Sequence, residues 1–152
     1  MGCPSPSSAF AVMHDGTAPT IGTTKNGAEW TVYNVEDFAT GIIRFKNNKS
    51  ITIRTSYFSN CAKDIFSCEI LGTKGGITWP DTIITKPYRN NVRRIKLKVE
   101  NSSLASVAEL SHFTSLIKGT DQAIIPLKQS VELIEIIDGL YKSAITEQIF
   151  HF

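Results

Sequence analysis

The fold is decided by residues 34–79, NVEDFATGIIRFKNNKSITIRTSYFSNCAKDIFSCEILGTKGGITW. Residues 35–45 and 50–58 are rich in β-branched and aromatic side chains, which favour strands. Between them, KNNK supplies a hairpin turn, because Asn tolerates positive φ. In the second strand Ile51 and Ile53 alternate with Thr52 and Arg54, the period-two pattern of a sheet with one buried face. The stretch therefore predicts the middle of one antiparallel sheet.

Further strands are expected on both sides of this hairpin. Residues 64–71 predict a third strand, and the glycines of 72–76 turn the chain into residues 77–79. Three other segments have strand-like composition or alternation: 8–14, 82–85 and 92–99, with a loop at 86–91 before the last. Residues 147–152 predict a short terminal strand or tail.

Two helices follow the strands. Residues 101–103 offer N-caps for a first helix, which Gly119 closes, and Pro126 suits the first position of a second helix. The apolar positions of the second helix are Leu127, Val131, Ile134, Ile137 and Tyr141, widened by Leu133, Ile136 and Leu140. A helix with apolar residues around so much of its circumference is expected to be largely buried. The predicted fold class is α+β: a mainly antiparallel open sheet with helices packed on one face.

Composition excludes several classes of protein. A chain of 152 residues fits a single domain, residues 1–152, and its net charge of +2 gives no strong attraction to nucleic acid or anionic membrane. The three cysteines form no CxxC pair, which indicates reduced thiols, a cytoplasmic location and no metal site. The sequence has no apolar run of membrane-spanning length, and its start lacks the basic and apolar regions typical of a signal peptide. The six basic residues within 86–98 predict a solvated edge strand.

No catalytic group can be assembled from the sequence alone. His14, His112 and His151 are scattered along the chain, and His112 is interpreted as a structural histidine of the first helix. Glu36 and Asp37 are adjacent strand residues that would point to opposite faces. Glu132 and Glu135 lie one turn apart on a solvated helix face, so neither pair predicts acid–base catalysis.

The order of several motifs carries a resemblance to a known family. EDFATGIIRF, ITIRTSYF and DIFSCEILGTKGGI are followed by SVAELSHFTSLIKGT and IIPLKQSVELIEIIDGLYKSA. This order and spacing resembles the C-terminal domain of the Gfo/Idh/MocA oxidoreductases, which are NAD(P)-dependent sugar, inositol and biliverdin-type dehydrogenases. The resemblance covers nearly the whole chain.

The resemblance implies a site and a partner. It places the polar loop 59–64 toward a sugar or polyol substrate, and an ordinary polar hairpin loop is the alternative. The substrate-binding residues implied are Asn60, Lys63, Asp64, Tyr57 and Trp79. It also implies a homo-oligomer, a dimer, through the open sheet face, where Phe58, Phe66 or Ile70 would otherwise expose apolar surface. The alternative is that only polar residues lie outside.

The departures from the family pattern concern the cofactor. The chain contains no Gly-rich phosphate turn after a first strand, no E-K-P motif and no D-x-x-x-H helix. The N-terminal Rossmann domain is therefore expected to be absent, and the chain alone is expected to hold no cofactor and to be inactive. NAD or NADP is implied for an intact parent that oxidises or reduces a polyol. The competing hypothesis is a stand-alone, non-enzymatic module that dimerises or binds a small ligand.

Overall fold

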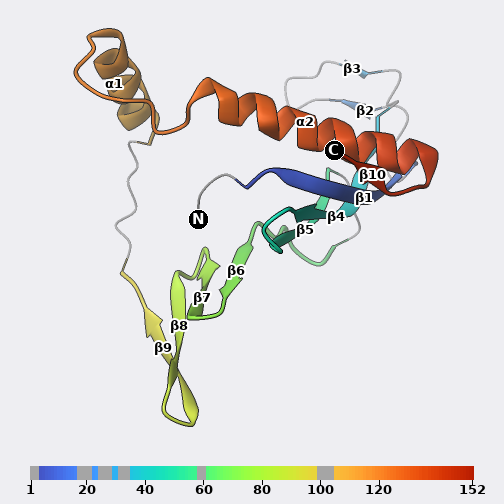
Figure 1. Ribbon diagram of the computed structural model, residues 1–152. Helices are drawn as coiled ribbons and strands as arrows, with labels where there is room; N and C mark the ends of the chain where they lie inside the picture. Colours follow the sequence, from blue (N-terminus) through green and yellow to red (C-terminus); the bar gives the residue numbers. More distant parts are fainter. Residues whose placement is uncertain (1–3, 17–21, 24–28, 31–34, 58–60, 99–104) are drawn as a thin grey trace. The chain divides into compact units, whose positions relative to one another are not determined.

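The computed structural model places the chain in two compact units (Figure 1). Unit 1 comprises residues 1–60 and 123–152, and unit 2 comprises residues 61–122. The residues that the structure describes are 4–16, 22–23, 29–30, 35–57, 61–98 and 105–152. Each unit is considered by itself.

Unit 1 is built on a four-stranded antiparallel sheet of order β10-β1-β4-β5. Its strands are β1 (Pro6–His14), β4 (Phe38–Phe45), β5 (Ser50–Ser56) and β10 (Phe150–His151). The predicted β4–β5 hairpin is confirmed, with Asn48 at φ 60° in its turn. The terminal strand β10 pairs with β1, and β2 (Gly22–Thr23) pairs with β3 (Glu29–Trp30) as a separate two-stranded ribbon.

Helix α2 (Leu127–Thr146) runs across one face of this sheet, over β1 (Figure 1). The buried apolar core consists of Ala9, Ala11, Ile43, Phe45 and Leu140. Small side chains let helix and sheet approach closely. At Gly41 of β4, an added Cβ would lie 2.9 Å from the Phe10 carbonyl oxygen and 3.0 Å from Leu140 Cδ2. The absence of a side chain at Gly41 is therefore a packing requirement rather than a turn requirement.

Ser143 fixes α2 to the sheet by hydrogen bonds. Its side chain is fully buried, and its Oγ accepts a hydrogen bond from the Ala11 amide at 3.2 Å. The same hydroxyl donates to the Gln148 carbonyl oxygen at 2.6 Å, in the turn that leads to β10. One buried hydroxyl thus satisfies a donor of β1 and an acceptor of the C-terminal turn, both of which would be costly to leave unpaired.

Unit 2 contains a second antiparallel sheet of order β6-β7-β8-β9. Its strands are β6 (Cys68–Gly72), β7 (Gly75–Trp79), β8 (Ile83–Tyr88) and β9 (Asn91–Lys96). The register aligns one isoleucine from each strand in a row across the sheet: Ile70, Ile77, Ile84 and Ile95. Cross-strand rows of β-branched residues stabilise a sheet of this kind.

Helix α1 (Ala105–Ile117) also belongs to unit 2, and it ends as the sequence predicts. Gly119 adopts a left-handed φ of 68°. Its amide donates to the Leu116 carbonyl oxygen, and the Thr120 amide donates to that of Ser115, each at 3.0 Å. This is the double hydrogen bond of a Schellman motif, which a glycine at this position favours.

The α+β class with antiparallel open sheets is confirmed, but several details differ. The stretch 34–79 does not form the middle of one sheet: β4 and β5 belong to the first sheet, β6 and β7 to the second. The predicted strand 64–71 begins only at Cys68. The predicted loop at 86–91 is also wrong in part, since Lys86, Pro87 and Tyr88 extend β8.

The expectation that the second helix is largely buried is wrong. Only Gly139, Leu140 and Ser143 of α2 are buried, whereas Leu127 is 81% exposed and Ile134 is 63% exposed. The helix contacts β1 through one narrow side, and its other apolar side faces away from that strand. Pro126 was expected at the first helical position. It is instead the N-cap residue, with an extended backbone, so the helix begins one residue later, at Leu127.

Replacing Gly41 with alanine tests the close approach of α2. We expect Gly41→Ala to lower the free energy of unfolding by about 1–3 kcal/mol, because the new methyl group meets a backbone carbonyl that cannot move aside cheaply. Urea denaturation followed by circular dichroism measures the change. Ser130→Ala, at an exposed position of α2, is the control and is expected to change stability by less than about 0.5 kcal/mol. Equal stabilities for the two variants would contradict this packing.

Candidate functional site

One end of the unit 1 sheet gathers polar residues around Asp37. The Asp37 amide donates to the His14 carbonyl oxygen at 3.0 Å, where β1 ends. The Asp37 carbonyl oxygen accepts hydrogen bonds from the Tyr57 amide at 2.9 Å and from Ser56 Oγ at 3.0 Å, where β5 ends. The backbone of Asp37 thus joins three strand ends, and its side chain is only 1% exposed. This arrangement fixes the backbone from which Tyr57 projects.

The segment before β4 is also bonded to α2. The hydroxyl of Tyr141 donates to Oε1 of Glu36, which connects the C-terminal half of the helix to this end of the sheet. The hydrogen bond to the Glu36 carboxylate, aided by partial burial and by the negative charge, raises the pKa of Tyr141 above its ordinary value. The phenol therefore stays protonated, and keeps donating, over a wider pH range than that of a free tyrosine.

Tyr57 is the one predicted site residue that the structure describes in unit 1. Its amide continues the β4–β5 ladder for one residue beyond β5, and its side chain is 76% exposed. Side chains alternate along a strand, so Tyr57 continues the row of Ile53 and Thr55, whose cross-strand partners are Gly41 and Ala39. That row lies on the face of the sheet that α2 covers.

The other predicted site residues belong to unit 2, except Asn60, which lies outside the described residues. Lys63 and Asp64 are exposed in a segment without regular secondary structure. No hydrogen bond or ion pair joins either side chain to another residue of the described part of the chain. Both are therefore available to a polar ligand.

Trp79 stands at the end of β7 and is paired with a residue that the sequence did not predict for the site. The rings of Trp79 and Phe66 meet edge to face, with centroids 5.0 Å apart and planes at 88°. Both remain accessible, Trp79 at 45% and Phe66 at 82%. An exposed aromatic pair can take the apolar face of a ring-shaped ligand. The strand register explains why Phe66 lies near Trp79, since Cys68 pairs with Trp79 and Phe66 lies two residues before Cys68.

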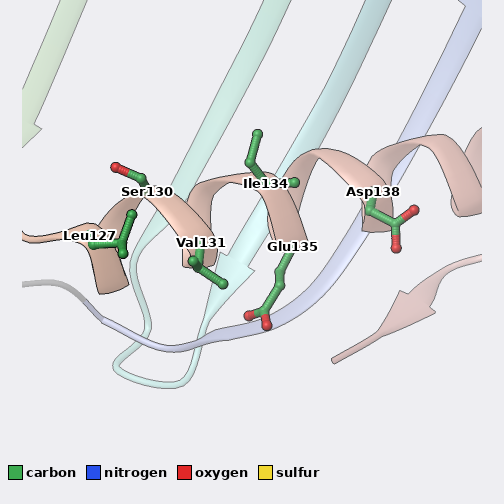
Figure 2. A pocket seen from close by; sticks show the side chains of 6 residues that line it. All are labelled: Leu127, Ser130, Val131, Ile134, Glu135 and Asp138. Atoms are coloured by element: carbon green, nitrogen blue, oxygen red, sulfur yellow. The ribbon is translucent and has the colours of Figure 1, made fainter.

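The described residues form two open hollows, one on α2 and one beside the glycine turn of unit 2, and neither contains a cluster of catalytic side chains. The larger, about 520 Å³, is an open groove lined only by α2, with Leu127, Val131 and Ile134 among its side chains (Figure 2). The smaller, about 260 Å³, lies beside the glycine turn of unit 2. There a Cβ on Gly75 would lie 2.4 Å from the Thr85 carbonyl oxygen of β8. Gly75 also has a positive φ of 146°, so both the turn and the neighbouring strand require a glycine at this position.

A surface histidine–carboxylate pair in unit 2 escaped the sequence analysis. Nδ1 of His112 lies 3.0 Å from Oδ2 of Asp121. The Gln122 amide, and then His112, lower the pKa of Asp121. The nearby hydroxyls of Thr114 and Ser115 donate to carbonyl oxygens of their own helix. The pair therefore ties the turn after α1 to the helix.

Among the described residues, no group of three or more histidine, cysteine, aspartate or glutamate side chains is placed to hold a metal ion. In the same part of the chain, no helix combines the length and apolar character that a membrane crossing requires.

Comparison with protein families gives a match over most of the chain. Residues 6–149 match the profile described as the oxidoreductase family, C-terminal alpha/beta domain, of the Gfo/Idh/MocA group. No curated protein sequence gives a match.

Solved structures share the fold at low sequence identity. The aldose-aldose oxidoreductase of Caulobacter crescentus, complexed with glycerol, has a TM-score of 0.67 at 15% identity. The NAD-binding oxidoreductase of Klebsiella pneumoniae has a TM-score of 0.75 at 12% identity. An oxidoreductase of Agrobacterium radiobacter, complexed with NAD⁺, L-tartaric acid and magnesium, has a TM-score of 0.66 at 15% identity.

The alignments cover nearly all of this chain but less than half of each similar structure. The alignments cover 98%, 97% and 97% of this chain, but only 42%, 45% and 43% of the three structures. The chain thus spans less than half the length of these proteins.

The Tyr141–Glu36 bond predicts a shifted phenol titration. A raised pKa means that the bond stabilises the fold fully below the unfolded pKa of about 10, and that this contribution is lost as the pH rises through the folded value. We expect absorbance titration near 295 nm to show a late-titrating tyrosine in the wild type. Tyr141→Phe should remove it, and Glu36→Gln should return it toward the ordinary range. Tyr88→Phe is the control; loss of the late component in that variant instead would contradict the assignment.

Proposed function

Because the chain belongs to the Gfo/Idh/MocA oxidoreductase family, over its C-terminal domain, we propose that it is the substrate-binding and assembly domain of an NAD(P)-dependent oxidoreductase. The substrate class is a sugar, an inositol or a similar polyol. The proposal rests on the family match over residues 6–149, together with the similar structures of an aldose-aldose oxidoreductase and of an oxidoreductase complexed with NAD⁺. The whole enzyme's reaction would be oxidation of a carbinol or reduction of a carbonyl.

In the proposed enzyme, this chain binds the substrate and another domain binds the cofactor. NAD or NADP would supply the hydride chemistry. The sequence has no G-x-G-x-x-G turn with which to hold a dinucleotide, and no D-x-x-x-H helix. The chain's own residues would bind and orient the polyol, and the N-terminal nucleotide-binding domain would belong to the remaining length seen in the structural neighbours. Alone, the chain is proposed to be inactive.

The substrate-binding residues proposed are Tyr57, Asn60, Lys63, Asp64 and Trp79. Lys63 would donate to a hydroxyl oxygen, and Asp64 would accept from a hydroxyl group, since each is exposed and has no described polar partner. Trp79, with Phe66 against its edge, would lie along the C–H face of the sugar. This combination of charged hydroxyl partners and an aromatic platform favours a polyol over an apolar ligand.

Binding of a simple polyol tests this assignment. We expect myo-inositol or D-glucose to give saturable chemical-shift changes in ¹⁵N-labelled wild-type protein, without added cofactor. Trp79→Ala should weaken the binding about tenfold, because losing about 50 Å² of apolar contact at about 25 cal/mol per Å² costs about 1.3 kcal/mol. Tyr88→Ala removes an aromatic residue of similar exposure from β8 and should leave the affinity unchanged. A wild type whose spectrum does not respond to either polyol would overturn the substrate assignment.

The proposed assembly is a homodimer through the open face of the unit 1 sheet. On that face Phe10 stands opposite Ile42 in the β1–β4 register, with Val12 nearby. They are 42%, 50% and 38% exposed, respectively. Apolar side chains grouped on an exposed sheet favour a partner surface, and a two-fold dimer covers the same patch on both copies.

Light scattering tests the dimer. We expect the wild type to have the mass of two chains, and Ile42→Lys to be a monomer, because a two-fold interface would bury a lysine from each copy. Ile134→Lys is the control: it places the same charge on an isoleucine of α2 that is 63% exposed. A monomeric wild type, or a dimer lost only in Ile134→Lys, would contradict this interface.

A further inference from the structure

Strands β8 and β9 of unit 2 form a hairpin (Figure 1) whose charged side chains are all positive. Residues 83–96 contain no carboxylate and five basic side chains: Lys86, Arg89, Arg93, Arg94 and Lys96. Within the described part of unit 2, the one ion pair joins His112 to Asp121, so no carboxylate there is paired with the hairpin. The hairpin therefore presents positive charge that this part of the chain does not neutralise.

The strand register divides these charges between the two faces of the hairpin. Lys86 is paired with Arg93, whereas Arg94 is paired with Thr85. Because side chains alternate along a strand, Arg93 and Arg94 project from opposite faces. Lys86 and Arg93 are thus directly opposite each other on one face, where Cβ atoms of such pairs are about 4.5–5.5 Å apart and like charges destabilise the sheet.

Protection of the sheet edge explains only some of these cations. β9 is an edge strand, and charged side chains on an edge discourage pairing with another chain. β8 is an internal strand between β7 and β9, so Lys86 does not protect an edge. It nevertheless stands where it repels Arg93. An anion bound by both side chains would replace this repulsion with two attractions.

The surroundings of Lys86 add a third donor and a place for a ligand. A Cβ on Gly75 would lie 3.4 Å from Lys86 Cγ, so the lysine stem lies beside the turn between β6 and β7. Asn91 shares the face of Arg93, two residues away on β9. Lys86 and Asn91 both line the open hollow of about 260 Å³ beside this turn. The side chains of Lys86, Asn91 and Arg93 are all exposed and can donate N–H groups to one ligand.

We propose that Lys86, Arg93 and Asn91 bind the phosphate group of a small ligand on this face of the hairpin. A guanidinium can donate two parallel hydrogen bonds to phosphate oxygens, and an ammonium adds a compact charge. A phosphate monoester carries a charge of about −1.5 to −2 at pH 7, which the two cations together balance. A nucleic acid, in contrast, is bound through a series of phosphate contacts, and here Arg94 projects from the other face.

This phosphate site is distinct from the proposed polyol site, and it does not rest on the proposed function. Gly75, beside Lys86, begins β7, and Trp79 ends it. At about 3.3 Å per residue, the two ends of the strand are roughly 13 Å apart. The two sites can therefore be titrated separately.

Titration of the ¹⁵N-labelled chain with inorganic phosphate at constant ionic strength tests the site. The wild type should show saturable chemical-shift changes at the amides of β8 and β9. Lys86→Gln and Arg93→Gln should each weaken binding about tenfold or more, as expected for loss of a charge-assisted hydrogen bond. Arg94→Gln is the matched control: it removes the same charge from the adjacent position, but on the opposite face, where salt screens it, and should change the affinity less than about twofold.

Urea denaturation gives a second readout and shows that the variants are folded. Phosphate should raise the unfolding midpoint of the wild type and of Arg94→Gln, because a ligand of the folded state stabilises it, and should raise that of Lys86→Gln much less. Phosphate also stabilises proteins generally by exclusion from their surface. An equal rise in all variants would show only this general effect and would overturn the inference.

Two further results would exclude the site. Equal weakening in Arg93→Gln and Arg94→Gln would show a diffuse attraction to the charged hairpin. Hairpin amides that respond to a single-stranded oligonucleotide or to phosphatidylserine vesicles, but to neither inorganic phosphate nor glucose 6-phosphate, would exclude a small phosphate ligand. We expect glucose 6-phosphate to shift the same hairpin amides as inorganic phosphate, and glucose to leave them unchanged.

Discussion

The close contact between α2 and β1 is the constraint on which the rest of unit 1 depends. Ala9 and Ala11 on β1, with Gly41 behind them on β4, leave room for Leu140 and for the Ser143 hydroxyl. Larger side chains would lift the helix from the sheet and break the bond between Ser143 and the Ala11 amide. They would also displace β10, because the same hydroxyl holds the turn at Gln148. A few small residues therefore fix both the helix and the C-terminus.

This contact also determines what lies at the Asp37 end of the sheet. Tyr141 stands one residue beyond Leu140, so the helix that buries Leu140 in the core brings Tyr141 to Glu36. Asp37 then joins the ends of β1 and β5 through its backbone. Core packing and site geometry are thus connected through two neighbouring helix residues. A substitution that shifts α2 would disturb Glu36 and Tyr57 as well as the stability of the fold.

Local patterns predicted the elements better than their assembly. Strand-like composition found β1 and β4, and alternation found β5. The Asn residues located the hairpin turn and Gly119 the end of α1, because all these signals depend on residues close in sequence. The division into two sheets depends on whether β5 and β6 pair with each other, which strand composition does not encode. The helical pattern of α2 was recognised, but apolar residues around a helix do not indicate which side of the helix packs against another element. Within unit 1, only the narrow side that carries Gly139, Leu140 and Ser143 is buried.

The candidate site divides in the same way. The five predicted binding residues came from a resemblance of ordered motifs, which preserves sequence positions but not contacts: Tyr57, Asn60, Lys63, Asp64 and Trp79. Phe66 and Trp79 became a pair only through the β6–β7 register. Glu36 was set aside because adjacent strand residues point to opposite faces. The structure places both residues before β4, which begins at Phe38, so strand alternation does not apply to them. The argument also gave no sign of Tyr141, which lies 105 positions later and donates to Glu36. The hydrogen bond between Tyr141 and Glu36 depends on the close packing of α2, which the small residues Ala9, Ala11 and Gly41 allow, and it could not be predicted without that packing.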